Sequence, residues 1–172
     1  MAITYEPIAT TTLATAASSI TFSSIPSTYT DLRLVMNGTT SAADWSYLRF
    51  NGDTGSSTLY SVNKLAGSGT ANQLHTITNY DKLQLGDALF GVGTSTTIPV
   101  FVTADIFSYA NTSYYKGILT SISGDLNGSG YVYRNANLYR SASAISSMVI
   151  SNASGSNFSI GFTATLYGIK AA

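Results

Sequence analysis

The sequence predicts an all-β fold, namely an antiparallel β-sandwich of jelly-roll type with about eight to ten strands. Three observations lead to this prediction: the residue types, their alternation, and the turn signals between alternating segments. Thr, Val, Ile, Tyr and Phe suit a pleated, half-buried surface, and Ser, Gly and Asn suit turns. The 172 residues suffice for one domain with a substantial core. We therefore expect a single β-sandwich domain over 1–172.

Alternation with a period of two residues is the dominant pattern. In 100–109, every second residue from Val100 to Ile106 is apolar, and the residues between them fall on the other face. Several such segments carry bulky side chains on both faces, which is typical of sheets that are covered on two sides. The strands are expected among the following ranges: 5–12, 19–23, 30–37, 46–51, 58–63, 88–93, 98–109, 115–123, 131–140, 145–151 and 158–169.

Turn signals separate these segments. The Asn-Gly pairs at 37–38, 51–52 and 127–128 favour the positive φ angles of tight turns. Residues 123–130 and 151–157 are rich in Ser, Gly and Asn and are expected to be hairpin tips. Residues 70–85 alternate poorly, so the sequence predicts a short helix or a long loop there.

The N-terminal residues 1–19 are rich in Ala and Thr and have little amphipathic character. Two interpretations fit them. The segment is either a β-arm that leaves the domain and contacts a neighbour, or a first edge strand followed by a loop.

Charged residues are scarce, and this excludes several classes of function. They make up 9% of the chain, with eight basic and eight acidic side chains and a net charge of zero, against about 25% in an ordinary soluble domain. No two basic residues are adjacent, whereas phosphate binding needs clustered Lys and Arg. No apolar run is long enough for a transmembrane helix, and residues 1–12 lack the pattern of a secretory signal. We expect neither a nucleic-acid nor a membrane partner.

No arrangement of residues indicates catalysis or a cofactor. His75 is the single histidine, no G-x-S-x-G elbow is present, and no local motif pairs two acidic residues. His75 is interpreted as a loop residue with ordinary polar contacts. Asp105 lies in the middle of an expected strand, so we expect it to be half-buried beside an Arg or at a trimer axis. The sequence predicts no enzyme and no catalytic residue.

Two loops have a weak resemblance to calcium sites, 51–55 and 125–129. Calcium needs several closely spaced oxygen ligands, and each loop offers one carboxylate. The chain has no cysteine, so thiolate metal sites and disulfides are absent. Asx and Asn-Gly turns explain both loops, and no metal ligand is predicted.

Aromatic residues are numerous, with 12 Tyr, 7 Phe and 1 Trp. Tyr combines a large rigid surface with a polar tip and is enriched at interfaces. The aromatics are therefore interpreted as a subunit interface, a sugar-stacking platform, or core and cross-strand packing. Trp45, Tyr114 and Tyr115 are the candidates for intersubunit or outward contact.

Five segments together resemble a known family: 5–10 (YEPIAT), 20–35 (ITFSSIPSTYTDLRLV), 48–53 (LRFNGD), 138–150 (LYRSASAISSMVI) and 162–170 (FTATLYGIK). They are similar to virion proteins of tailed bacteriophages, which are common in phages of cyanobacteria and other aquatic bacteria. The resemblance covers most of the chain. It implies a jelly-roll module, typically a trimer, that serves on the outside of the virion as a capsid decoration (cement) protein or as part of a tail fibre or baseplate. It supplies no catalytic residues.

We therefore expect a capsid decoration protein that stabilises the phage head as a homotrimer. It would be assembled in the host cytoplasm and lie on the outer surface of the head. Its partners would be its own copies and the major capsid protein, with Tyr5 and Ile8 as shell contacts. The alternative is a tail-fibre or baseplate module that binds a host surface receptor or glycan. A third class is a cellular lectin-like domain.

Overall fold

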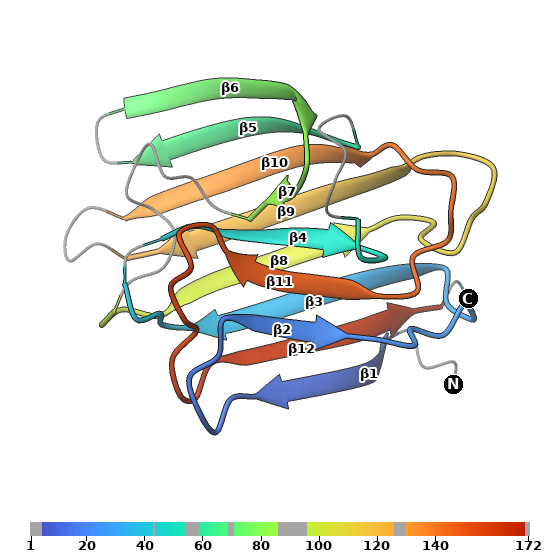
Figure 1. The fold of residues 1–172 in the computed structure, drawn as a ribbon. Coiled ribbons are helices and arrows are strands. Elements are labelled where there is room, and N and C mark those ends of the chain that lie inside the picture. Colours follow the sequence, from blue (N-terminus) through green and yellow to red (C-terminus); the bar gives the residue numbers. More distant parts are fainter. Residues whose placement is uncertain are drawn as a thin grey trace.

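The structure of the protein is a computed structural model, and it describes residues 5–42, 44–53, 59–68, 71–85, 96–125 and 130–170. Two antiparallel sheets pack face to face (Figure 1). The predicted all-β antiparallel sandwich is confirmed. The part of the chain that the structure describes contains no helix, and therefore none that is long and apolar enough to cross a membrane.

The large sheet has eight strands, and the small sheet has four. In spatial order, the large sheet consists of β1 (Tyr5–Thr12), β12 (Thr163–Ile169), β3 (Asp31–Gly38), β8 (Val100–Ile106), β9 (Lys116–Gly124), β10 (Tyr131–Tyr139), β5 (Tyr60–Ser68) and β6 (Ala71–Tyr80). The small sheet consists of β2 (Ser19–Phe22), β11 (Met148–Asn152), β4 (Ser46–Phe50) and β7 (Leu83–Gln84).

The strands pair in a nested order along the chain. β1 pairs with β12, β2 with β11, β3 with β8, and β4 with β7. Two hairpins, β5–β6 and β9–β10, are inserted into this scheme and extend one side of the large sheet. The large sheet therefore ends in β1 on one side and in β6 on the other (Figure 1).

The sequence prediction was wrong in several places. The Asn-Gly pair at 37–38 lies at the end of β3, and Asn37 has no positive φ angle. Residues 70–85 contain β6 and β7 and no helix; β6 is exposed on both of its faces, so it lacks the alternation that reveals a half-buried strand. His75 consequently lies on a strand and not in a loop. Residues 151–157 are not a hairpin tip, because β11 and β12 belong to different sheets. The described residues form twelve strands, more than expected. The strand expected at 88–93 lies outside them.

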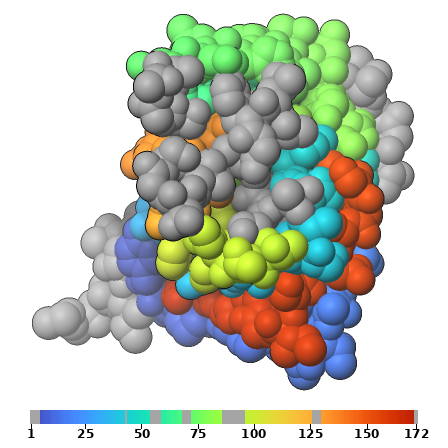
Figure 2. All heavy atoms as spheres, turned by 90° about the vertical axis from the view of Figure 1, so that its left-hand side faces the viewer, coloured from blue at the N-terminus to red at the C-terminus, as the bar shows by residue number. Residues whose placement is uncertain are grey.

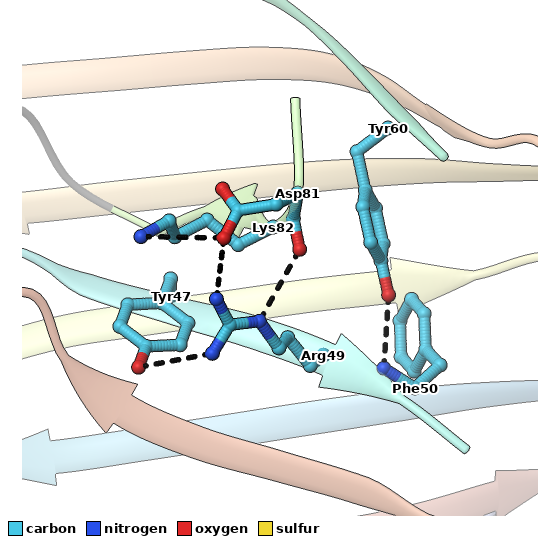
Figure 3. Close-up of polar contacts among 6 residues, drawn as sticks. All are labelled: Tyr47, Arg49, Phe50, Tyr60, Asp81 and Lys82. Atoms are coloured by element: carbon cyan, nitrogen blue, oxygen red, sulfur yellow. Dashed lines mark hydrogen bonds and ion pairs between the residues drawn. The ribbon is translucent and has the colours of Figure 1, made fainter. Parts of the chain in front are cut away.

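The core lies between the sheets and is built by alternate residues of each strand. In β3, the inward residues Leu32, Leu34 and Met36 are buried, and the intervening residues are partly exposed. Aromatic rings fill one part of this core: the ring centroids of Phe50 and Tyr60 each lie 5.1 Å from that of Tyr139. The Phe50 N–H donates to the buried Tyr60 hydroxyl at 3.0 Å (Figure 3).

The turn after β4 has the conformation that its Asn-Gly pair predicts. Asn51 and Gly52 have φ angles of 56° and 73°, and the Asp53 N–H donates to the Phe50 carbonyl at 3.0 Å. Positive φ at both central residues is the signature of a tight hairpin-type turn.

Where the inserted hairpins extend the large sheet, one row of its inner face becomes polar, while Val62, Ile118 and Ile122 on either side of this row are buried in the core. In the central register row, Leu34 and Ala104 are followed by Thr120, Asn135 and Lys64, all of them buried. The Asn135 side chain donates to the Gln84 carbonyl at 3.2 Å. Several other buried polar atoms lack a hydrogen-bond partner: Gln84 Oε1, Thr120 Oγ1, Asn135 Oδ1, and both amide atoms of Asn137.

We expect Asn137→Leu to raise the free energy of unfolding by about 1–2 kcal/mol, because it replaces two unpaired buried polar atoms with an apolar group of similar shape. Asn135→Leu is the matched control and should lower stability, since it removes a hydrogen bond. Urea unfolding of both variants is the measurement. A loss of stability in Asn137→Leu would contradict the assumption that the Asn137 amide has no hydrogen-bond partner. It would indicate that the amide binds a buried water.

Candidate functional site

The outer face of the large sheet carries a cluster of exposed apolar side chains. Leu74 on β6 is 83% exposed, and Leu65 on β5, Val132 on β10 and Leu119 on β9 are each about half exposed. We call these four residues the apolar outer face. A groove of about 470 Å³ runs between Leu65, Leu74 and Leu119. Ala136 also lines it, and its polar lining residues include Asn63, Thr103, Asp105, Ser121 and Arg134. A single polypeptide rarely leaves a contiguous apolar surface of this kind uncovered.

The outer face of the large sheet becomes apolar at its β5–β6 end. Along one outward row, Thr165, Val35, Thr103, Ser121 and Arg134 are followed by Leu65 and Leu74. The inner row beside it changes in the opposite sense, from apolar to polar. Over β5 and β6, the apolar residues of these two rows therefore face outward.

The other half of the outer face is mainly polar, although Phe101 on β8 is 54% exposed there. Arg33 and Asp105, which are direct partners on β3 and β8, form a bidentate ion pair with N···O distances of 2.5 and 2.8 Å. Asp105 is half-buried and pairs with Arg33, as the sequence predicted. The hydroxyls of Thr10 and Thr165 lie 3.1 Å apart across β1 and β12.

Tyr114 and Tyr115 lie in the loop between β8 and β9, and each is 54% exposed. Hydrogen bonds from a buried lysine hold the loop in place. Lys116 is completely buried, and its ammonium donates to the carbonyls of Tyr114 and Ser141 at 3.2 and 3.1 Å; burial lowers the pKa of Lys116. The Asn111 side chain accepts the Tyr114 N–H at 3.1 Å. Both tyrosines therefore point outward from a fixed loop, and their role in contacts stays a prediction.

Trp45 belongs to a different surface, on the outer side of the small sheet. The Lys82 ammonium lies 5.6 Å from the Trp45 ring centroid, 4.8 Å from Tyr47 and 5.6 Å from Tyr80. Arg49 donates to the carboxylate of Asp81 at 2.5 Å and to its carbonyl at 3.2 Å (Figure 3). The cation–aromatic cluster is made up of Trp45, Tyr47, Arg49, Tyr80, Asp81 and Lys82.

This cluster connects β4 with the residues just before β7 through cation–aromatic contacts. A cation over an aromatic face is stabilised by the ring quadrupole, and Lys82 occupies that position for three rings. The Trp45 ring is partly buried and is engaged within the chain. Sequence reasoning missed Lys82 as its partner, because the two residues are far apart in the chain and no local signal connects them.

Tyr5 and Ile8, the predicted shell contacts, lie on β1. Tyr5 is 46% exposed, and the Arg33 guanidinium carbon lies 5.6 Å from its ring centroid. Ile8 is partly buried and packs against the core. Of the two interpretations of the N-terminal segment, the structure shows the first edge strand, which pairs with β12 of the same chain. A contact of this strand with a neighbouring molecule stays a prediction.

Asp44, next to Trp45, was not singled out by the sequence analysis and organises the loop after β11. Its carboxylate accepts hydrogen bonds from the Trp45 N–H at 2.7 Å, the Ser154 N–H at 2.9 Å and the Ser156 hydroxyl at 2.9 Å. Burial alone would raise the pKa of Asp44, but the hydrogen bonds from Ser154, Trp45 and Ser156 outweigh it and hold the pKa below its usual value. Ser154 and Ser156 lie more than one hundred residues away, so no local pattern announces them.

The described residues contain no group of three or more His, Cys, Asp or Glu side chains that could hold a metal ion. In the first of the two calcium-like loops, Asp53 accepts a hydrogen bond from the Tyr139 hydroxyl. Burial and this carboxylate raise the pKa of Tyr139 to about 12. Residues 54–55 and 126–129 of the two loops lie outside the described residues.

Comparison with protein-family models finds no match, and comparison with curated proteins finds none. Among solved structures, the chain is similar to a mutant of the alginate lyase Aly36B in complex with an alginate tetrasaccharide. The identity is 11%, the TM-score is 0.30, and the match covers 98% of this chain and 75% of that chain. A similarity at this TM-score supports no inference about fold or activity.

We expect Asp44→Asn to lower the free energy of unfolding at pH 7 by about 2–3 kcal/mol, because it weakens several charge-assisted hydrogen bonds to a buried carboxylate. The folded-state pKa of Asp44 lies below the unfolded one, so this stabilisation is complete above the unfolded pKa, about 4. It disappears as the pH falls through the folded pKa.

Urea unfolding of wild type and Asp44→Asn at pH 7 and at pH 2.5–3 is therefore the measurement. The difference between the two proteins should shrink in acid. A difference that is the same at both pH values would show that the Asp44 charge does not contribute to stability.

Proposed function

We propose that the protein is a virion structural protein of a tailed bacteriophage, a capsid decoration (cement) protein that acts as a homotrimer. We infer that eight of its strands form a jelly roll, because the nested pairs β1–β12, β2–β11, β3–β8 and β4–β7 are those that a rolled-up hairpin produces. The resemblance of the sequence to phage virion proteins supports the same proposal.

The observation that carries this proposal is the group of exposed apolar side chains on the outer face of the large sheet. Leu65, Leu74, Leu119 and Val132 face outward over strands whose central inward row is polar. Such a surface is suited to lie against other protein, since exposed apolar patches of this kind mark interaction sites. A cement protein needs surfaces of this kind both for its own copies and for the shell.

In the proposed arrangement, the part of the apolar outer face around Leu119 and Val132, together with Tyr114 and Tyr115, contacts neighbouring copies in the trimer. The β1 side with Tyr5 contacts the shell. Three copies would sit over a local threefold junction and clamp the capsid subunits against the pressure of the packaged DNA. Because these contacts are apolar and hydroxyl-rich, attachment depends only weakly on salt.

The alternative, a tail-fibre or baseplate module that binds a host glycan, has one observation in its favour. The rings of Tyr114 and Tyr115 are exposed on a fixed loop and are available for stacking. Two observations favour the cement proposal over it. The side chains that form the apolar part of the groove are aliphatic, and the Trp45 ring is already covered by Lys82.

Immunogold labelling of intact virions tests where the protein lies. The cement proposal expects gold spread over the head. Gold confined to the tail would overturn it and favour the glycan-binding alternative, for which a glycan array is the next measurement.

Heating tests the clamping role. Particles stripped of the protein should release their DNA at a lower temperature, and adding wild-type protein back should restore the original release temperature. Leu119→Arg should restore it poorly, because it places a charge in the apolar outer face. Ile160→Arg is the matched control, an equally drastic change at an aliphatic residue that is 70% exposed and lies outside that face. An unchanged release temperature after stripping would contradict the proposal.

A further inference from the structure

β6 is a long edge strand with an open side. It spans Ala71–Tyr80 and pairs with β5 alone among the described strands. In Figure 2, the green atoms of β5 and β6 form the upper margin of the molecule, and the N-terminal strands lie toward the opposite margin. An exposed edge presents unpaired N–H and C=O groups that act as a template for another strand.

The opposite edge, β1, carries three features that disfavour pairing with another strand. Pro7 removes a backbone donor, and the pairing with β12 shifts register next to it. Glu6 is held by the Lys170 ammonium at 2.9 Å and by the Tyr29 hydroxyl at 3.0 Å. β6 also has a register shift, but it lies at the C-terminal end between Ile77 and Tyr80, where Arg140 donates to the Thr78 carbonyl and the Asn79 side chain. The sequence 71–80 (ANQLHTITNY) contains no Pro, Asp, Glu, Lys or Arg. Charge and Pro are the usual means of blocking an edge, so among the described residues 72–76 form an edge without these features.

The register of the β5–β6 hairpin identifies the backbone groups that are open. Ser68 is the partner of Ala71, and two residues separate them, so this closing pair is hydrogen-bonded. Hydrogen-bonded and non-hydrogen-bonded pairs alternate in an antiparallel ladder. The residues that direct their N–H and C=O away from β5 are therefore Asn72, Leu74 and Thr76, and the pairing is regular over this stretch.

We propose that β6 pairs with β6 of a second copy of this chain, antiparallel and about a twofold axis at Leu74. This register pairs Leu74 with its own counterpart and Asn72 with Thr76 of the second copy, so all three open residues of each copy are used. The Cα atoms of such a pair lie about 5.5 Å apart. The two Leu74 side chains, the most exposed large apolar residues of the described chain, then cover one another.

Charge and surface continuity favour a second copy as the occupant. Self-pairing places each side chain near its own kind, so a charged strand would repel itself; β6 has no acidic residue, Lys or Arg, and so avoids this penalty. Leu65 is the direct neighbour of Leu74. Joining two copies therefore makes one continuous apolar surface from two half-surfaces.

This inference goes beyond the proposed function. The proposed trimer closes about a threefold axis, whereas the β6 contact is twofold and would link copies that belong to neighbouring trimers. It is a property of the isolated protein and can be tested without virions.

Cysteine cross-linking tests the geometry, because the chain has no cysteine of its own. Leu74→Cys should form a covalent dimer with a short thiol–thiol cross-linker, since the two Cβ atoms of a hydrogen-bonded pair lie about 5.5 Å apart, within reach of such a reagent and wider than a disulfide prefers. Ile160→Cys, at another highly exposed aliphatic position, controls for random collision. Leu119→Arg in the Leu74→Cys background should keep the cross-link, because Leu119 lies on β9. A cross-link that forms no faster at residue 74 than at residue 160 would overturn the proposal.

Sedimentation equilibrium of the cysteine-free protein over a concentration series tests the backbone pairing. Thr76→Pro removes an outward donor without breaking the β5–β6 bonds and should weaken the twofold contact at least about tenfold. Thr76→Ala keeps the donor and should not. Leu74→Lys, which needs no backbone change, should act like Thr76→Pro, and Ile160→Lys should have no effect. Equal association of all variants would overturn the proposal. So would a protein that stays monomeric while Leu74→Cys cross-links to the shell protein in particles.

Discussion

The rest of the structure depends on one constraint: alternate side chains of two sheets of unequal size must be buried between them. The small sheet has four strands and the large sheet eight. In the central row of the large sheet, the inward residues Leu166, Leu34 and Ala104 are apolar and buried. In the inserted hairpins the same row continues with Thr120 and Asn135. In this row, the apolar side chains of the core thus come from the nested part of the fold.

The inserted hairpins satisfy the constraint in a different way. They place Leu65, Leu74, Leu119 and Val132 on the outside, so part of their apolar surface is left for other protein to cover. The nested strands and the hairpins both contribute to the core, and the hairpins also carry the apolar outer face that the proposed assembly uses.

Much of the nested part could be predicted from the sequence, and much of the rest could not. β3, β8 and β12 alternate cleanly because one face is buried, and Asp105 was expected beside an Arg since it lies in the middle of such a strand. β6 escaped detection because both of its faces are exposed, and exposure leaves no pattern. The pairing of Asp44 with Ser154 and Ser156, and of Trp45 with Lys82, depends on contacts between distant segments. Residue type and local spacing do not encode such contacts.

The scarcity of charge links the stability of the chain to its association. Several of the few ionic groups form ion pairs within the chain: Arg33 pairs with Asp105, Arg49 with Asp81, and Lys170 with Glu6. Few remain to keep surfaces apart, and a net charge of zero adds no long-range repulsion between copies. Edges and faces must then be controlled by geometry. At β1, Pro7 and the register shift provide that control. At β6 the register shift lies near Tyr80, and 72–76 contain neither Pro nor a charged residue. An uncharged strand can therefore pair there, and β6 of another copy is such a strand.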